Sequence, residues 1–242
     1  MKSVCICYWG VTRTLRHTYN SHLENIINVF KNEGWECDIF IHCWKTQNHH
    51  IWSWKCDVNE DEELNFIENV IKPYKCVVEN QDEWLSTFPI KDYIDHPSFM
   101  DSSNNEWLRP TLIKNHICSL YSQKAVTQMV TNCEKQYDYV FYIRPDAIIE
   151  GSFPIQSIPN NPKVMLLPTH GHWSGLNDQM ALISKEYCSY YGNRIDELDN
   201  FRKPTGILTD GSYSSEMFIR FISNKYFECV LQCQFPFYLL RP

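Results

Sequence analysis

The sequence lacks any apolar run long enough to cross a membrane and any run of Lys or Arg that could line up along nucleic-acid phosphates. A membrane helix needs about 20 consecutive apolar residues, and nucleic-acid binding requires a basic stripe. Here 22 basic residues stand against 29 acidic ones, for a net charge of −7. We therefore expect no membrane span and no nucleic-acid partner.

Disulfide and zinc frameworks are also missing. The eleven cysteines are odd in number, contain no C-x-x-C pair and lie mostly inside apolar runs, whereas disulfide scaffolds and zinc ribbons need regularly paired cysteines. The apolar run at residues 4–11 has no small-residue cleavage site of the kind that ends a secretory signal peptide. We expect a soluble, cytoplasmic protein, in the host cytoplasm if its source is a virus.

The sequence does contain enough apolar surface for one large core. Of its 242 residues, 43% are hydrophobic and 14% are aromatic, while only 21% are charged. This composition excludes disorder and a coiled coil. A chain of this length buries roughly 70% of its unfolded surface, so it needs no metal or disulfide to fold. A single domain over residues 1–242 is the simplest expectation.

Strand and helix patterns alternate from the start of the chain. Residues 2–9 are apolar on both alternating faces, as in a strand buried on both sides of a parallel sheet. A helix follows with an apolar stripe over residues 23–30. We expect this helix to begin in a capping box formed by Ser21 and Glu24, and to end at Gly34.

The alternation continues to the end of the chain. Further strands are predicted at 38–44, 74–79, 137–143 and 163–167, and helices at 60–71, 111–130, 185–200 and 214–224. Residues 81–110 have no clean period, and we expect an irregular excursion there. The pattern predicts an α/β fold, a three-layer α/β/α sandwich around a mostly parallel sheet with right-handed crossovers.

Polar clusters follow the predicted strands, where ligands of open α/β sheets gather. In the cluster at 9–14, Gly10 permits close backbone approach, and Thr12 and Arg13 offer donors to a phosphate. A turn with solvated arginines explains this cluster slightly better when it is taken alone. The cluster around His42 is equally consistent with a core histidine under an aromatic lid.

The segment Arg144-Pro145-Asp146 is the most informative, because Pro145 ends an ordinary central-strand ladder. A carboxylate at the mouth of a central strand is poorly placed for stability but well placed to hold a divalent cation against a diphosphate. The arginine beside it suits a phosphate equally. The structural alternative is a buried pair between Arg144 and Asp146 that closes the strand.

Two further acids lie downstream. Asp178 could deprotonate or orient a sugar hydroxyl, with Trp173 offering an apolar face to the sugar ring, or it could cap the element that follows. Glu216 follows two serines and is more simply a first-turn acid of a helix. His170 and His172 supply too few ligands for a structural zinc.

Together, residues 9–15, 37–44, 137–146 and 177–179 resemble the GT-A type glycosyltransferases of bacterial capsule clusters and large DNA viruses, including the chlorovirus enzymes. The resemblance implies a Rossmann-like half over 1–146 that binds a nucleotide-diphospho-sugar, such as a UDP- or GDP-sugar, and an acceptor-side half that takes a glycan. It also implies Mn²⁺ or Mg²⁺.

The resemblance also implies roles for individual residues. Asp146 would hold the metal, and Asp178 would be the general base, with Glu216 in reserve. Arg144 stands where the family often has a first acid, and one carboxylate binds a hard cation less well than two. The donor site would be lined by Trp9, Gly10, Thr12, Arg13, His42, Ser119, Gln123 and Arg144.

Other classes of protein remain open at this point. A catalytically inactive scaffold of the same fold would bind a nucleotide or carbohydrate without chemistry. A nucleotidyl- or phosphotransferase is not supported, because the sequence has no G-x-x-x-x-G-K-[ST] loop. A cysteine hydrolase lacks a cysteine at a helix start beside a candidate base. The sugar, the acceptor, the stereochemical outcome and the oligomeric state are not predicted.

Overall fold

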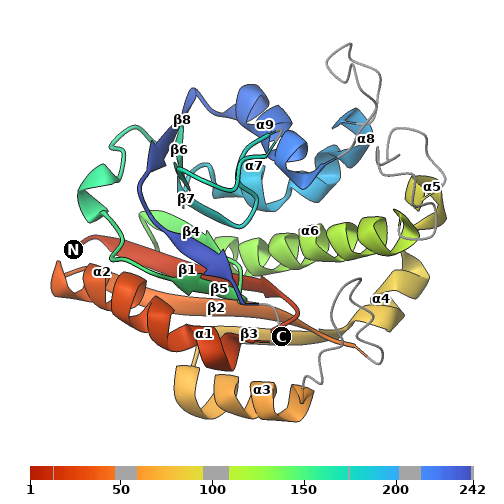
Figure 1. Cartoon of the computed structure of the whole chain (residues 1–242), viewed down its shortest axis with the longest axis horizontal. Helices are drawn as coiled ribbons and strands as arrows, with labels where there is room; N and C mark the ends of the chain where they lie inside the picture. Colours follow the sequence, from red (N-terminus) through yellow and green to blue (C-terminus); the bar gives the residue numbers. More distant parts are fainter. Residues whose placement is uncertain (13, 47–58, 95–108, 174, 202–213, 241–242) are drawn as a thin grey trace.

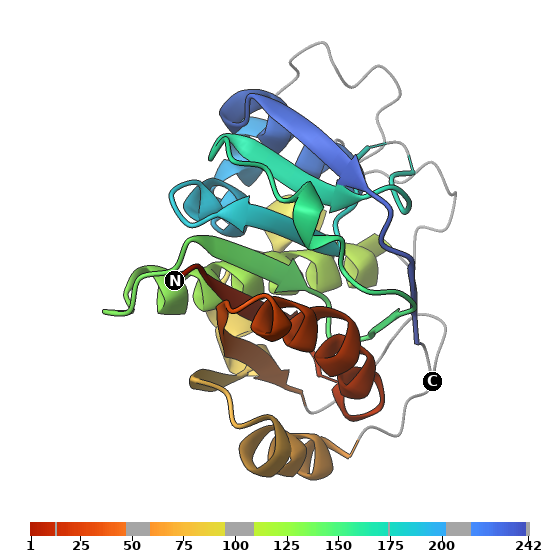
Figure 2. The same ribbon diagram turned by 90° about the vertical axis from the view of Figure 1, so that its left-hand side faces the viewer.

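The computed structural model describes residues 1–12, 14–46, 59–94, 109–173, 175–201 and 214–240. A seven-stranded sheet in the order β3-β2-β1-β4-β7-β6-β8 forms the middle layer, with helices on both faces (Figures 1 and 2). Its strands are β1 (Ser3–Gly10), β2 (Glu36–Lys45), β3 (Lys75–Asn80), β4 (Tyr139–Ile143), β6 (Val164–Pro168), β7 (Met180–Ser184) and β8 (Cys229–Cys233).

The strand directions confirm the predicted fold class, an α/β/α sandwich with a mostly parallel sheet. Strands β1 to β4 are mutually parallel, and β6 pairs parallel with β8. Only β7 is reversed, between β4 and β6. The core of β1, from Val4 to Tyr8, has no exposed surface, which explains why both of its faces are apolar.

One face of the sheet carries a continuous helix made of α1 (Leu15–His22), a π-turn η1 (Leu23–Ile27) and α2 (Asn28–Asn32). The predicted capping box is therefore wrong, because the helix starts about two turns before Ser21. The Ser21 hydroxyl instead donates to the carbonyl of Thr18 and accepts from the N–H of Ile149. Gly34 does follow the helix end, in the left-handed region at φ +76°. The same face carries α3 (Glu60–Phe66) and η2 (Ile67–Ile71).

The opposite face is covered by the long α6 (Arg109–Thr131), with α7 (Cys188–Gly192) and α9 (Ser215–Tyr226) beside it (Figure 1). The expected excursion at 81–110 contains α4 (Gln81–Thr87) and α5 (Lys91–Ile94). Asn80 starts α4 by accepting from the N–H groups of Asp82 and Glu83, so the irregular interpretation is wrong there. Residues 95–108 lie outside the described part.

Short elements complete the fold. A two-stranded sheet joins β5 (Ala147–Ile149) to β9 (Phe237–Leu239), and neither strand was predicted. Single turns occur at η4 (Ile155–Ser157), η5 (Arg194–Glu197) and α8 (Leu198–Phe201). Within the described ranges, no helix has the length and apolar character that a bilayer crossing requires.

The crossovers determine where a ligand can bind. The connections from β1 to β2 and from β2 to β3 run over the α1 and α3 face, while α6 returns to β4 over the opposite face. The strand order therefore grows outwards from β1 through β2 to β3 on one side and continues from β4 on the other. In open α/β sheets, a reversal of strand order opens a crevice beyond the carboxyl ends of the two strands where it occurs, here β1 and β4.

The buried His22 predicts a loss of stability in acid. Its ring accepts a hydrogen bond from the Tyr8 hydroxyl at 3.0 Å and donates to the carbonyl of Ala147. Burial lowers its pKa to about 4, below the ordinary 6.5, so this stabilisation is present above pH 6.5 and is lost as the pH falls towards 4. The difference amounts to roughly 3 kcal/mol.

Urea unfolding across this pH range, on the unmodified chain and on His22→Gln, measures the effect. We expect a shallower loss of unfolding free energy on acidification in the variant. His17→Gln, at an exposed position of the same helix, is the control and should keep the parental slope. Equal slopes in all three proteins would contradict the prediction.

Candidate active site

Four of the loops at the carboxyl edge of the sheet concern the site. Three follow the parallel strands β1, β2 and β4, and the fourth joins the end of β6 to the start of β7, which is reversed. The start of α9 is fastened to this edge, where the N–H of Leu176 donates to the carbonyl of Glu216 at 2.9 Å. Gly175 allows this contact, since a Cβ there would lie 2.0 Å from the Glu216 carbonyl group.

The end of β1 is anchored by α6. The Trp9 indole donates to the Ser119 hydroxyl at 3.2 Å, and the Gly10 N–H donates to the Ser122 hydroxyl at 2.7 Å. Gly10 has φ +95°, which only glycine adopts easily, and no heavy atom of a residue that the structure describes lies within 4 Å of the position a Cβ would take. The backbone at Gly10 therefore faces open space.

Two further residues of this loop, Thr12 and Arg13, are predicted to contact a donor. Thr12 is buried, and its carbonyl accepts from the N–H of Leu15 at 2.7 Å. Arg13 lies outside the described residues. The predicted contacts of both residues with a donor stay predictions.

His42 lies behind the edge rather than on it. Its side chain is fully buried, its Nδ1 lies 2.6 Å from the Ser122 hydroxyl, and its Nε2 lies 3.6 Å from the Glu79 carboxylate. Burial lowers the pKa of His42, although Glu79 opposes that shift. The ring stands edge-on to Trp44 at 5.0 Å, as in the alternative of a core histidine. Its predicted role in donor binding stays a prediction, and the geometry connects it to Gly10 through Ser122.

Gln123 of α6 and Tyr191 of α7 are both fully buried and lie next to each other. Gln123 has no exposed surface, and neither polar atom of its side chain has a hydrogen-bond partner within the described structure. The Tyr191 hydroxyl also has no partner at ordinary hydrogen-bond geometry, although Gln123 and Arg194 lie beside it. Burial raises the pKa of Tyr191 to about 12, and these two side chains oppose the shift. Unsatisfied buried polar groups cost about 1–3 kcal/mol each. Sequence reasoning missed Tyr191 and Ser122, although Ser122 lies one helical turn after Ser119.

At the end of β4, Arg144 and Asp146 form a bidentate pair. Arg144 Nε donates to Asp146 Oδ1 at 2.9 Å, and Nη2 donates to Oδ2 at 2.7 Å. The Asp146 side chain is 3% exposed and that of Arg144 is 25% exposed. Burial would lower the pKa of Arg144, but the neighbouring carboxylates, Asp146 first, raise it. The structure thus contains the pair of the structural alternative, and places it at the carboxyl end of β4 with the Arg144 side chain partly exposed.

Asp178 and Glu216 lie beside this pair. Both are half-buried, and both are close enough to Arg144 to raise its pKa. The pKa of Glu216 is itself raised, first by burial and then by the charge of Asp178. The Ser214 hydroxyl accepts from the N–H of Met217 at 3.1 Å and caps α9, which confirms that Glu216 lies in the first turn of a helix.

Asn177, rather than Asp178, fixes the loop before β7. Its Oδ1 accepts from the N–H groups of Gln179 and Met180 at 2.9 and 3.0 Å, and its Nδ2 donates to the carbonyl of His170 at 2.8 Å. The capping role considered for Asp178 is therefore filled by its neighbour. This leaves the Asp178 carboxylate available at the edge.

The side chains in the described ranges do not fit a resident divalent cation. No group of three or more His, Cys, Asp and Glu side chains there is arranged to hold a metal ion. Mg²⁺ and Mn²⁺ prefer several convergent oxygen ligands, and both oxygens of Asp146 already accept from Arg144. The metal role of Asp146 stays a prediction.

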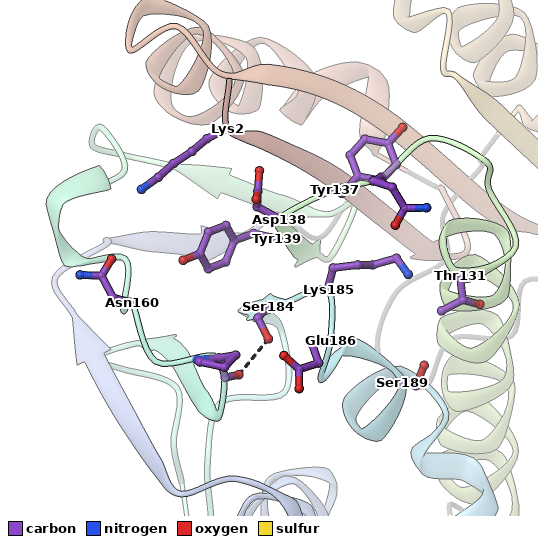
Figure 3. Close-up of a pocket in the computed structure, with 12 residues that line it drawn as sticks. Lys2, Thr131, Tyr137, Asp138, Tyr139, Asn160, Ser184, Lys185, Glu186 and Ser189 are labelled. Atoms are coloured by element: carbon purple, nitrogen blue, oxygen red, sulfur yellow. Dashed lines mark hydrogen bonds between the residues drawn. The ribbon is translucent and has the colours of Figure 1, made fainter.

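A cavity of about 750 Å³ lies at the amino edge instead (Figure 3). Its polar groups are largely used by the fold. The Asp138 carboxylate accepts from the N–H of Ser3 at 2.7 Å, and the Ser184 hydroxyl donates to the carbonyl of Pro162 at 2.8 Å. None of the predicted site residues lines this cavity. A further cavity, about 430 Å³, lies among α4, α5, α6 and the segment of η5 and α8.

No family model matches the chain, and no curated protein matches it. Among solved structures it is similar to the galactosyltransferase LgtC in complex with donor and acceptor sugar analogs, at 9% identity and TM-score 0.49, over 95% of this chain and 73% of that one.

It is also similar to the glycosyltransferase GlyE of Streptococcus pneumoniae, at 9% identity and TM-score 0.47, over 95% of this chain and 45% of that one. A third similar structure is that of a glycosyltransferase involved in the glycosylation of the major capsid of PBCV-1, at 9% identity and TM-score 0.43, over 96% of this chain and 82% of that one. The chain thus spans less than half the length of GlyE. Likenesses this distant carry no argument about its activity.

The raised pKa of Glu216 predicts that Glu216→Gln stabilises the fold near neutral pH. The folded protein holds the Glu216 proton more tightly than the unfolded chain does, so ionisation costs stability as the pH rises through the folded pKa. Each pKa unit is equivalent to about 1.4 kcal/mol. We expect the variant to melt above the parent at pH 7 and together with it near pH 4. Thermal melts across that range measure this, and a variant less stable at pH 7 would contradict it.

Proposed function

We propose that this protein is a glycosyltransferase of the GT-A type, which moves a hexosyl or pentosyl group from a nucleotide-diphospho-sugar to a hydroxyl of a glycan or other acceptor. One observation carries the proposal. At the carboxyl end of β4, next to the end of β1 that carries Gly10, the guanidinium of Arg144 is paired with Asp146 and lies within electrostatic range of two half-buried acids, Asp178 and Glu216. The sequence resemblance to GT-A enzymes supports it.

The charges suit the two halves of a group transfer. A leaving diphosphate needs positive charge and hydrogen-bond donors, which Arg144 and the Gly10 turn would supply. The acceptor hydroxyl needs a carboxylate to take its proton. Asp178 is the first candidate because its backbone is fixed by Asn177 and its side chain caps nothing. Glu216 is the second. Residues 1–146 would then carry the donor and 147–242 the acceptor.

The transfer follows from these placements. The bond between the anomeric carbon and the β-phosphate oxygen breaks, and its electron pair stays on the phosphate. The acceptor oxygen bonds to the anomeric carbon and gives its proton to the carboxylate. Charge on the anomeric carbon builds as the leaving group departs, so stabilising the diphosphate would contribute most.

A thermal-shift screen tests the function itself. We expect either a UDP- or a GDP-sugar to raise the melting temperature of the full chain, because binding only to the folded state adds about 2.7 kcal/mol of stability at a hundred times Kd. Slow hydrolysis of the same donor should follow. Binding without hydrolysis or transfer to any acceptor would favour the inactive scaffold, and the absence of any shift would overturn the proposal.

The acids can be tested by amide substitution. Asp178→Asn should lower transfer by about 10²–10⁴-fold, as loss of a general base does, while donor binding stays within a few-fold. Glu216→Gln tests the second candidate for the base in the same assay. Glu228→Gln, an exposed acid just before β8, is the matched control and should retain transfer. Full transfer by both Asp178→Asn and Glu216→Gln would remove the assignment of the acceptor side.

A further inference from the structure

The pair at the end of β4 disagrees with the divalent cation that the sequence resemblance implies. A cation at Asp146 would need the two oxygens that Arg144 already occupies, at 2.9 and 2.7 Å. A fork-to-fork pair of this kind is among the strongest hydrogen-bonded ion pairs. Metal binding would have to displace the guanidinium and leave its charge unpaired in a site that is only 25% exposed.

Arg144 retains donors for another anion. A guanidinium has five N–H groups, and the pair with Asp146 uses two of them. The remaining three make no hydrogen bond to any residue that the structure describes. The side chain stays partly exposed, so those donors are accessible while Asp146 fixes the plane of the group. An arginine held in this way is preorganised to bind a phosphate in two-pronged fashion.

The register of the sheet puts this group where the diphosphate of a nucleotide would lie. Tyr8 of β1 is opposite Ile143 of β4, so Gly10 and Arg144 follow on neighbouring strands within two residues of that pair. The main chain at Gly10 faces open space, and a ligand can approach there without meeting a side chain of the described residues. The fork and the open turn therefore lie on the same stretch of the carboxyl edge.

We propose that Arg144, oriented by Asp146, neutralises the donor diphosphate in place of a divalent cation, so that nucleotide binding and sugar transfer need no metal. This inference rests on the proposed function. In the transfer step, the guanidinium donates hydrogen bonds to the departing β-phosphate and keeps its own proton. The acceptor proton goes to the carboxylate of Asp178, with Glu216 as the second candidate. Asp146 is then a positioning residue.

Calorimetric titration of the full chain with UDP and with GDP, in excess Mn²⁺ and in EDTA, tests this. On the unmodified protein we expect the nucleotide that binds to show Kd values within about threefold of each other in the two buffers, a difference below 1 kcal/mol. Arg144→Gln should weaken binding about tenfold or more in both buffers, because hydrogen bonds to a charged group are lost.

Two further variants complete the test. Arg144→Lys keeps the charge but not the fork, and we expect binding between that of the parent and Arg144→Gln. Lys124→Gln removes a cation that pairs with Asp196 on the far side of α6, and should bind as the parent does. Circular dichroism checks that each variant is folded, and the comparison of buffers on the parent does not depend on any variant.

Two outcomes would overturn the inference. A larger gain in affinity from Mn²⁺, lost in Asp146→Asn, would show that Asp146 holds a cation and would leave the proposed function intact. No binding of any nucleotide in either buffer would overturn the proposed function, and this inference with it.

Discussion

The fork between Arg144 and Asp146 connects the fold of this protein to its proposed chemistry. It stands where β4 stops, because Pro145 ends the ladder of the central strand and the chain turns towards β5. There it places a fixed positive charge at the edge where the crossovers diverge. The acids within electrostatic range of that charge come from the loop before β7 and from the start of α9, so three distant segments converge on it.

Hydrogen bonds from buried side chains fix the segments that meet at the carboxyl edge of the sheet. Ser122 binds both the end of β1 and the buried ring of His42, and Asn177 holds the loop that carries Asp178. These contacts sit on α6 and at the start of β7, which are packed into the core. The groups that would meet a ligand are thereby carried on rigid elements, whose position depends little on the ligand.

The sequence predicts the fold well wherever periodicity is strong. The doubly apolar strands at 2–9 and 137–143 and the long helix at 111–130 are all present, within two residues at most ends. Predictions from local sequence patterns failed where contacts with distant parts of the chain determine the secondary structure. The capping box at Ser21 is buried inside a longer helix that begins at Leu15, and the short strands β5 and β9 have no pattern of their own, because each is stabilised only by pairing with the other.

The candidate site is predicted in its parts but not in its pairing. Gly10, Arg144 and Asp146 were predicted as site residues because they follow predicted strands, and the order of residues along the chain is enough to show that. That Arg144 uses both oxygens of Asp146 depends on side-chain geometry, which spacing does not determine. The unsatisfied Tyr191 hydroxyl and the anchoring role of Ser122 likewise arise only when α6 packs against α7 and β1.

The most direct measurement of the central claim is the position of a bound nucleotide, in a crystal structure of the protein soaked with UDP or GDP without added metal. The account predicts the diphosphate beyond the ends of β1 and β4, with phosphate oxygens within hydrogen-bond distance of the free N–H groups of Arg144. A nucleotide seated in the cavity at the amino edge, or a diphosphate that leaves Arg144 untouched, would contradict it.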